Sequence, residues 1–484
     1  MVFSSPIFLF VFFPITLGFY YLIKSATPGT NRLANLWLLV ASIFFYAWSA
    51  PKSTYLLFFC VGIIFDFFIA LLIARNYRTN NLTISAKLLL TIAIGLNLVF
   101  LGYYKYANFF FEVFIDSTSA SQVNWRVVIL PIGISFIVFH KISYLVDVYR
   151  RKVQPRRSLP EFMLYLLFFP QLIAGPIVRY HTIADQIDKR THSVNDVFEG
   201  MYRFALGLGK KVLLANPLGS VADSVFAQPV SSLDPTLAWF GILMYALQIY
   251  FDFSGYSDMA IGLGKMFGFQ LPENFNRPYI AKSVSEFWRR WHISLSSFFR
   301  DYVYIPLGGN HFTLQRTLIN LWIVFILCGL WHGAKWTFLF WGAYYGFWLT
   351  LERLFLARLL EKMPRAMANA YTFLVILIGW VFFRSPDLDY AFSYVATMFN
   401  VKSLASANGH LYDLTIDFGF STKVAICLLI GLAACFVPDS SAARFDIDER
   451  HLTYAKGTLT IALLAYSLIT LASGTFNPFL YFQF

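Results

Sequence analysis

The chain has few charged residues for its length. Asp, Glu, Lys and Arg make up only 13% of its 484 residues, whereas hydrophobic residues make up 58%. Soluble domains contain about 25% charged and roughly 45–50% apolar residues. A soluble core cannot contain this much apolar surface, so the composition excludes a water-soluble globular fold. It predicts instead an all-α polytopic membrane protein.

Cysteine and the common catalytic motifs are also scarce. The four cysteines lie in apolar stretches, without the close spacing of a metal site or a disulfide framework, so we expect buried thiols without a redox role. They are Cys60, Cys328, Cys427 and Cys435. The HExxH, GxSxG, Walker and GxGxxG motifs are absent as placed patterns. Metal-dependent, serine-hydrolase and nucleotide chemistry therefore have no support, and we expect no bound metal.

Long uncharged stretches recur along the whole chain. The first, Pro6–Ile23, is long enough to cross about 30 Å of hydrocarbon at about 1.5 Å per helical residue. Similar stretches, interrupted only by Asp66 and Lys141, follow at Leu36–Ala50, Tyr55–Ala74, Leu88–Tyr104, Val127–Val146, Leu237–Ile249, Leu318–Leu330, Trp336–Leu351, Tyr371–Phe383, Val424–Val437 and Leu459–Ala472. We predict about ten or eleven transmembrane helices in a single membrane domain, residues 1–484.

Basic residues are concentrated in alternate loops. One set of loops contains Lys24, Arg32, Arg75, Arg78, Lys87, Arg150, Arg151, Lys152, Arg156 and Arg157; the intervening set contains only Lys52, Lys105 and Arg126. Because basic loops stay in the cytoplasm, the amino terminus is predicted to be extracytoplasmic. The first span has no preceding basic residue and no following cleavage site, so we expect it to be retained. The formal charge of +12 is explained by loops that face anionic lipid, and we expect no nucleic-acid partner.

Polar residues within apolar runs are costly unless they face a partner or a cavity. In Tyr250–Gly264, an apolar run is interrupted by Asp252, Ser254 and Asp258 among small residues. On a helix, Gln248 would share a face with Asp252, and Ser254 with Asp258. Two interpretations stay open: hydrogen bonds that hold helices together, or a polar wall of a substrate cavity.

The segment Ser285–Asn310 is too charged to cross lipid and too aromatic to remain in water. We expect an interfacial or re-entrant helix protected by the bundle. Glu286 can pair with Arg290 one turn further on. That leaves Arg289 and His292 to face a common target, such as an anionic phosphate-bearing ligand. Headgroup anchoring by the arginines and a structural hydrogen bond of His292 are the alternatives.

His332 lies between two apolar runs. Counted from Arg316, it is deep in the hydrocarbon layer if the helix is straight, and Gly329 and Gly333 would leave space beside it. Imidazole titrates near neutral pH and can act as a general base. A packing role with a satisfied hydrogen bond is the alternative. The other histidines show no mutual metal-ligand spacing.

Several short motifs occur in a fixed order along the chain. They are Gly102–Asn108, Pro131–Phe136, Ile173–Ile177, Phe253–Asp258, Asn274–Tyr279, Phe287–His292, Pro306–Asn310, Leu330–Ala334 and Trp380–Arg384. This set resembles the membrane-bound O-acyltransferase family, and within it the membrane subunits of alginate and peptidoglycan O-acetylation. One departure follows Asn310, where these proteins commonly carry a basic residue and this chain has His311 and Phe312.

The resemblance implies a ring of tilted helices around a central funnel that narrows at His332, the catalytic residue. It implies a second functional histidine at His292, which would position the donor or hydrogen-bond its carbonyl oxygen. On this basis we expect substrate or donor binding by Arg289, Asp252, Ser254, Asp258, Asn310 and Trp331. The expected localisation is the bacterial inner membrane, with no permanently bound cofactor.

The implied reaction is acetyl transfer. A cytoplasmic thioester, expected to be acetyl-CoA, would give its acetyl group to an extracytoplasmic acetyltransferase partner for O-acetylation of a cell-surface polysaccharide. A D-alanyl-transfer subunit of teichoic-acid modification, with a carrier-protein thioester as donor, is the nearer alternative. A secondary transporter is the other, although the repeat symmetry expected of transporters is not seen.

The carboxyl terminus, Asn477–Phe484, places aromatic residues around Tyr481. One interpretation is an interfacial aromatic belt. The segment also resembles a carboxyl-terminal aromatic motif of related acyl-transfer systems, including the small partner protein of teichoic-acid D-alanylation. That resemblance implies that Tyr481 takes the acetyl group and holds it as a phenyl ester, which is reactive enough for a second transfer.

Overall fold

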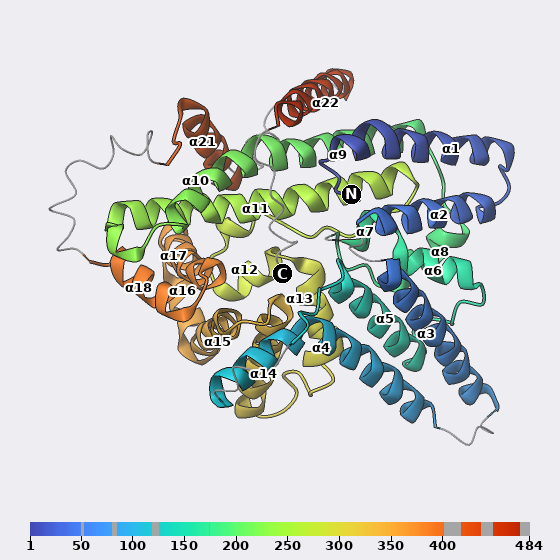
Figure 1. Cartoon of the computed structure of the whole chain (residues 1–484), viewed down its shortest axis with the longest axis horizontal. Helices are drawn as coiled ribbons and strands as arrows, with labels where there is room; N and C mark the ends of the chain where they lie inside the picture. Colours follow the sequence, from blue (N-terminus) through green and yellow to red (C-terminus); the bar gives the residue numbers. More distant parts are fainter. Residues whose placement is uncertain are drawn as a thin grey trace. The chain divides into compact units, whose positions relative to one another are not determined.

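The computed structural model describes residues 1–49, 53–79, 85–118, 125–173, 175–400, 418–436 and 449–474. Within these ranges the chain forms helices and no β-strand, which confirms the predicted all-α fold (Figure 1). The chain divides into two compact units. The first comprises Met1–Phe204 and Met259–Pro272, and the second comprises Ala205–Asp258 and Glu273–Phe484.

The first unit is built mainly from amino-terminal helices. They are η1 (Phe8–Phe12), α1 (Phe13–Ala26), α2 (Arg32–Ser49), α3 (Ser53–Thr79), α4 (Ala86–Thr118), α5 (Ile134–Tyr149), α6 (Leu159–Leu167), α7 (Phe169–Leu172), α8 (Tyr180–Asp188) and most of α9 (Val194–Gly209). Helices α3, α4 and α5 pack against one another. Asp66 of α3 pairs there with Lys141 of α5 at 2.9 Å, and Asn97 of α4 donates to both carboxylate oxygens at 3.1 Å. The two charges that interrupt the predicted spans therefore neutralise each other.

The second unit continues from the end of α9. It contains η2 (Lys210–Ala215), α10 (Asn216–Phe226), η3 (Val230–Ser232), most of α11 (Pro235–Met266), η4 (Pro278–Ile280), α12 (Val284–Arg290), α13 (Ile293–Phe299), η5 (Arg300–Tyr304), α14 (Leu314–His332), α15 (Trp336–Leu351), η6 (Glu352–Leu356), α16 (Ala357–Lys362), α17 (Arg365–Arg384), α18 (Leu388–Met398), α21 (Thr422–Phe436) and α22 (Glu449–Ala472). The predicted site residues that the structure describes all belong to this unit.

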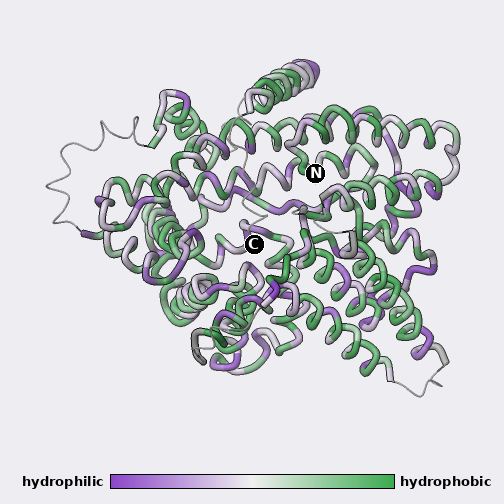
Figure 2. The backbone as a smooth tube through the Cα atoms, viewed as in Figure 1, coloured by the Kyte–Doolittle hydropathy of each residue, from purple (hydrophilic) through white to green (hydrophobic). Residues whose placement is uncertain are grey.

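Seven helices in the described ranges are long and apolar enough to cross a membrane. They are Phe8–Ala26, Tyr55–Tyr77, Ala86–Ile115, Pro235–Met266, Leu314–His332, Arg365–Arg384 and Glu449–Ala472. Arg32–Trp48 and Thr422–Phe436 are apolar but shorter. Figure 2 shows hydrophobic residues along most of the length of α3 and α4. The chain is thus a multi-pass membrane protein, and the count of ten or eleven crossings stays a prediction.

One predicted span begins later than expected. Val127–Val146 reads as one apolar run, but helix α5 begins only at Ile134. Gly133, just before it, has a left-handed backbone with φ of 73°, and a side chain there would contact the carbonyl oxygen of Leu172 at 2.7 Å. A left-handed residue cannot continue a right-handed helix. Residues 127–133 of the predicted span therefore lie outside helix α5.

Candidate active site

His332 is the last residue of α14, and α15 begins four residues later. The two helices pack directly against each other. Their closest approach is at Gly329 of α14 and Gly342 of α15, where any side chain would collide with the backbone of the other helix. Small residues allow such close packing of membrane helices. This contact fixes the end of α14, and with it the position of His332.

The His332 side chain is buried, with 3% of its surface exposed. Its ring lies edge-on to those of Trp341 and Phe383, at centroid distances of 5.0 and 5.1 Å. The expected space beside it at Gly329 and Gly333 is absent, because α15 packs against the first and the Phe338 ring covers the second. The sequence suggested a glycine-lined gap because it did not show that α15 folds back onto α14.

His292 lies at a break between two short helices. Helix α12 ends at Arg290 and α13 begins at Ile293, while His292 itself has a left-handed backbone with φ of 44°. Its side chain is fully buried. The two residues are not on one continuous helix, so the break between α12 and α13 separates Arg289 from His292, and their facing of a common target stays a prediction.

Asn274 determines which ring nitrogen of His292 carries the proton. Its side-chain oxygen lies 3.1 Å from His292 Nδ1 and also accepts from the backbone N–H and the hydroxyl of Ser294, at 3.2 and 2.9 Å. An amide oxygen only accepts hydrogen bonds, so Nδ1 carries the proton. Nε2 is then an acceptor, and it has no hydrogen-bond partner in the described part of the chain. No role was predicted for Asn274, because it lies far from His292 along the chain.

Burial keeps His292 neutral. The residue lies outside the seven candidate spans, and desolvation lowers its pKa to about 3. Its ring packs edge-on against Phe253 at 4.6 Å. The imidazole is therefore a neutral ring whose one unpartnered nitrogen can accept a hydrogen bond.

The Trp331 ring contacts both histidines. Its centroid lies 6.0 Å from the ring of His292 and 4.8 Å from that of His332. The structure thus brings together three predicted site residues, from α14 and from the break before α13. Trp331 and His332 are adjacent in the sequence, so what the fold adds is the position of His292 beside them.

The polar residues of α11 have a different environment. Asp252 pairs with Lys211 at 2.7 Å, with both side chains almost fully buried, and Asp258 pairs with Lys210 at 2.6 Å. These contacts favour the first interpretation, in which the carboxylates hold helices together. Ser254 is buried and its hydroxyl has no partner within the described ranges.

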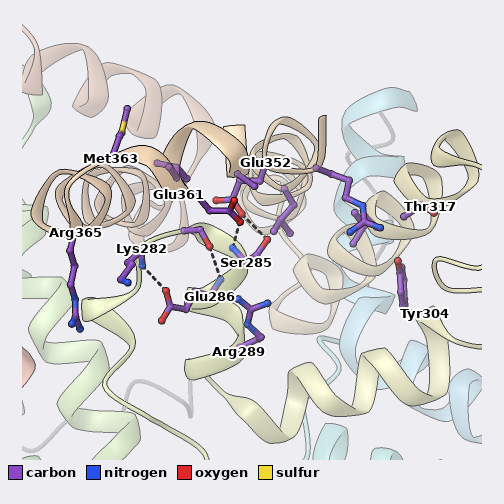
Figure 3. A pocket seen from close by; sticks show the side chains of 16 residues that line it. Lys282, Ser285, Glu286, Arg289, Tyr304, Thr317, Glu352, Glu361, Met363 and Arg365 are labelled. Atoms are coloured by element: carbon purple, nitrogen blue, oxygen red, sulfur yellow. Dashed lines mark hydrogen bonds between the residues drawn. The ribbon is translucent and has the colours of Figure 1, made fainter. Parts of the chain in front are cut away.

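Arg289 lines a cavity of about 600 Å³. Figure 3 shows it among other polar side chains, and Lys282, Arg353 and Arg365 are further basic residues of the same lining. The predicted pairing of Glu286 with Arg290 is confirmed, at 2.8 Å. Arg290 is thereby committed to an ion pair.

Glu352 fixes one wall of this cavity. Its carboxylate accepts hydrogen bonds from the backbone N–H and the hydroxyl of Ser285, at 2.9 and 2.6 Å (Figure 3). It also accepts from the backbone N–H of Val284, the first residue of α12. A carboxylate at a helix amino terminus is stabilised by free N–H groups and the helix dipole. Glu352 therefore anchors the helix that carries Arg289.

A second, mostly apolar cavity of about 470 Å³ shares Arg289, Ser285 and Tyr304 with the first. Its lining extends to Cys328 of α14. Cys328 and His332 are four residues apart on the same helix and so share a face. A polar cavity lined by four basic and three acidic side chains thus adjoins an apolar one that reaches within one helical turn of His332.

Comparison with known proteins supports the resemblance read from the motifs. The family model of the membrane-bound O-acyltransferases matches residues 34–386. A probable alginate O-acetylase, AlgI, of Azotobacter vinelandii is 41% identical over the whole of both chains. A peptidoglycan O-acetyltransferase of Helicobacter pylori is 34% identical, covering all of this chain and 98% of the relative. A teichoic acid D-alanyltransferase of Streptococcus thermophilus is 30% identical over 46% of this chain and 56% of its own.

The chain belongs to the membrane-bound O-acyltransferase family. It is therefore an O-acyltransferase, as the motifs indicated. The family match includes His292, His332 and Asn274, and it extends across the boundary between the two compact units. The single membrane domain over residues 1–484 stays a prediction.

Two further predicted site residues remain. Asn310 is exposed in the loop before α14, after two glycines with left-handed backbones, and it lines neither cavity. Tyr481 lies outside the described residues and outside the family match. Within the described ranges, no three His, Cys, Asp or Glu side chains form a candidate set of metal ligands.

Proposed function

We propose that the chain is a bacterial inner-membrane O-acetyltransferase that moves an acetyl group from a cytoplasmic thioester to an extracytoplasmic partner for polysaccharide O-acetylation. The supporting relatives are whole-length matches whose names specify acetylation of alginate or peptidoglycan. The concentration of basic residues in alternate loops supports an extracytoplasmic amino terminus.

The observation that carries the proposal is that two buried histidines, His292 and His332, both contact the ring of Trp331. In the proposed reaction, an acceptor hydroxyl attacks the thioester carbonyl while His332 takes its proton. The carbon–sulfur bond then breaks, and the thiol leaves with a proton returned from His332. General-base catalysis of this kind contributes about 10²–10⁴-fold to a rate.

His292 is proposed to position a reactant. Since Nδ1–H is committed to Asn274, the neutral ring has no proton on Nε2 to donate to a carbonyl oxygen. Of the two roles expected from the sequence, the contact therefore supports positioning over stabilisation of the oxyanion. Nε2 would accept from an amide N–H of the donor arm or from the attacking hydroxyl.

The two adjoining cavities fit a thioester donor of the coenzyme A type. The first offers Arg289, Lys282, Arg353 and Arg365 to phosphate groups, and the second offers an apolar lining to an extended arm. No permanently bound group is needed, because the donor itself supplies the activated acyl group. Tyr481 is the proposed acceptor, whose phenyl ester would pass the acetyl group to the partner.

D-alanyl transfer is the second candidate function. The D-alanyltransferase relative matches about half of this chain, and a carrier-protein thioester also presents a phosphate and an extended arm. Purified protein in lipid nanodiscs, offered acetyl-CoA, an acetylated carrier protein or a D-alanylated carrier protein, would separate the candidates by release of free thiol. Because Tyr481 is acylated only once without the partner, we expect an acetyl donor to release about one thiol per protein molecule. Thiol release only with the D-alanyl donor would support the second function, and no release with any donor would contradict both.

A further inference from the structure

The first unit contains a polar cavity of about 610 Å³ that the proposed acyl transfer does not use. It lies among the loop between α1 and α2, the segment before α6 and the end of α8. The candidate span Phe8–Ala26 ends at the first of these loops. The cavity is therefore at the end of a membrane-crossing helix, where lipid headgroups lie.

Two asparagine side chains brace the cavity. Asn31 donates to the backbone oxygen of Asp188 at 2.9 Å, and Asn35 donates to that of Ile187 at 3.0 Å. Lys24 in turn donates to the side-chain oxygen of Asn31 at 2.8 Å. These bonds tie the loop between α1 and α2 to the end of α8, so the cavity has a defined frame.

The cavity has an excess of positive charge. Arg156 pairs with both acidic residues of the lining, Glu161 at 2.8 Å and Asp188 at 2.7 Å. The remaining cations, Arg32, Arg157 and Lys189, are exposed, and Lys189 interacts electrostatically with Asp188, whose carboxylate already pairs with Arg156. Helices α2 and α6 also begin at the cavity, and a helix amino terminus favours an anion. An anionic group is therefore the expected occupant.

The Asn35 side chain adds a second requirement for the occupant of the cavity. The side chain is 4% exposed, it lines the cavity, and its oxygen has no hydrogen-bond partner within the described ranges. Its amide nitrogen is already bonded to Ile187, which fixes the orientation of the group. A buried acceptor without a partner costs free energy. The occupant should thus carry a hydroxyl that donates to Asn35 as well as an anion that meets the three cations.

We propose that this cavity binds the phosphoglycerol headgroup of an anionic membrane lipid. The phosphodiester would contact Arg32, Arg157 and Lys189, and a glycerol hydroxyl would donate to Asn35 Oδ1. Basic pockets between membrane helices are typical sites for anionic headgroups. Free glycerophosphate shares this chemistry, but the position at the end of Phe8–Ala26 favours the lipid, whose chains would remain in the bilayer.

Native mass spectrometry of the purified full-length protein tests the proposal. The probes are phosphatidylglycerol, phosphatidic acid, which lacks the glycerol headgroup, phosphatidylcholine and soluble glycerophosphoglycerol. The test variant is Arg157→Gln with Lys189→Gln, and the matched control is Lys87→Gln with Lys152→Gln. Lys87 and Lys152 are exposed and lie outside the cavity lining, so both variants lose the same charge. Thermal unfolding verifies that each variant is folded.

We expect phosphatidylglycerol to be retained by the native protein and the control, and about tenfold less by the test variant. If soluble glycerophosphoglycerol also binds, the cavity recognises the phosphoglycerol group whether it is free or part of a lipid. If it does not bind, the occupant is the lipid. Equal losses in both variants would overturn the site. Equal retention of phosphatidic acid and phosphatidylglycerol would overturn the hydroxyl contact with Asn35.

Discussion

The side-chain oxygen of Asn274 lies 3.1 Å from His292 Nδ1 and leaves Nε2 as the free acceptor of a buried imidazole. The same asparagine donates to the hydroxyl of Ser257 on α11 at 3.2 Å. Asn274 therefore links α11 to the break between α12 and α13 that carries His292. Because it contacts the ring, we propose that Asn274 is a positioning residue for the acyl transfer.

Replacing Asn274 is the first test of that role. Asn274→Ala should lower acetyl transfer about 10²-fold, because a small misplacement of a reacting group costs about that much. Asn274→Asp should raise the pKa of His292 by placing a carboxylate beside Nδ1, so activity should be lost at a higher pH on the acid side of the pH–rate profile. Asn276→Ala is the control, since Asn276 is exposed in the same motif. An unchanged profile in Asn274→Asp would contradict the assignment.

The ion pair between Lys211 and Asp252 is predicted to stabilise the fold and not to bind substrate. Asp252→Leu removes the carboxylate that pairs with the buried Lys211, and breaking a buried ion pair costs about 3–5 kcal/mol. We expect this variant to accumulate poorly in membranes and to unfold at a lower temperature. Lys211→Met combined with Asp252→Leu should recover most of the loss. A single variant as stable as the native protein, or a double variant no better than the single, would contradict this role.

Arg289 is predicted to bind the phosphate of the donor. Arg289→Gln should raise the KM for the thioester donor about tenfold with kcat nearly unchanged, because a hydrogen bond between charged groups contributes about 1.5–3 kcal/mol. Arg290→Gln is the matched control, since Arg290 is paired with Glu286. Steady-state kinetics with purified protein would measure both. An equal rise in KM for the two variants would show that net charge, and not the cavity, binds the donor.

Tyr481 is predicted to carry the acetyl group. Tyr481→Phe keeps the ring and removes only the oxygen, so polysaccharide acetylation should stop while the protein still accumulates. Mass spectrometry of the native protein should find an acetyl group on the carboxyl-terminal peptide. Normal acetylation by Tyr481→Phe would show that the residue is an anchor in the aromatic belt.

The sequence predicted the long apolar helices and the local motifs. Stretches such as Tyr55–Ala74 are long and apolar enough to cross a membrane, and the motif Leu330–Ala334 marked His332 as a candidate site residue. The pairing of Glu286 with Arg290 was also predictable, because it depends on one helical turn.

Contacts between distant segments were not predictable in this way. Asn274 meets His292 because the intervening chain folds back, and no spacing rule covers that return. Lys210 and Lys211 lie in a helical run, Val194–Phe226, that is not apolar enough to stand out as a span. The signal for that run in the sequence was a set of apolar residues at about helical spacing, Phe204, Leu208 and Val212, which the structure buries.

The most direct test of the central proposal is acetyl transfer by His332→Ala and His332→Gln in purified protein with its donor. Size-exclusion chromatography verifies that both variants are folded, and His311→Ala is the control, because His311 is exposed in the loop before α14. We predict that both His332 variants lose about 10²–10⁴-fold in rate and that the control keeps its activity. Near-native acetyl transfer by a folded His332 variant would contradict the assignment of His332 as the general base.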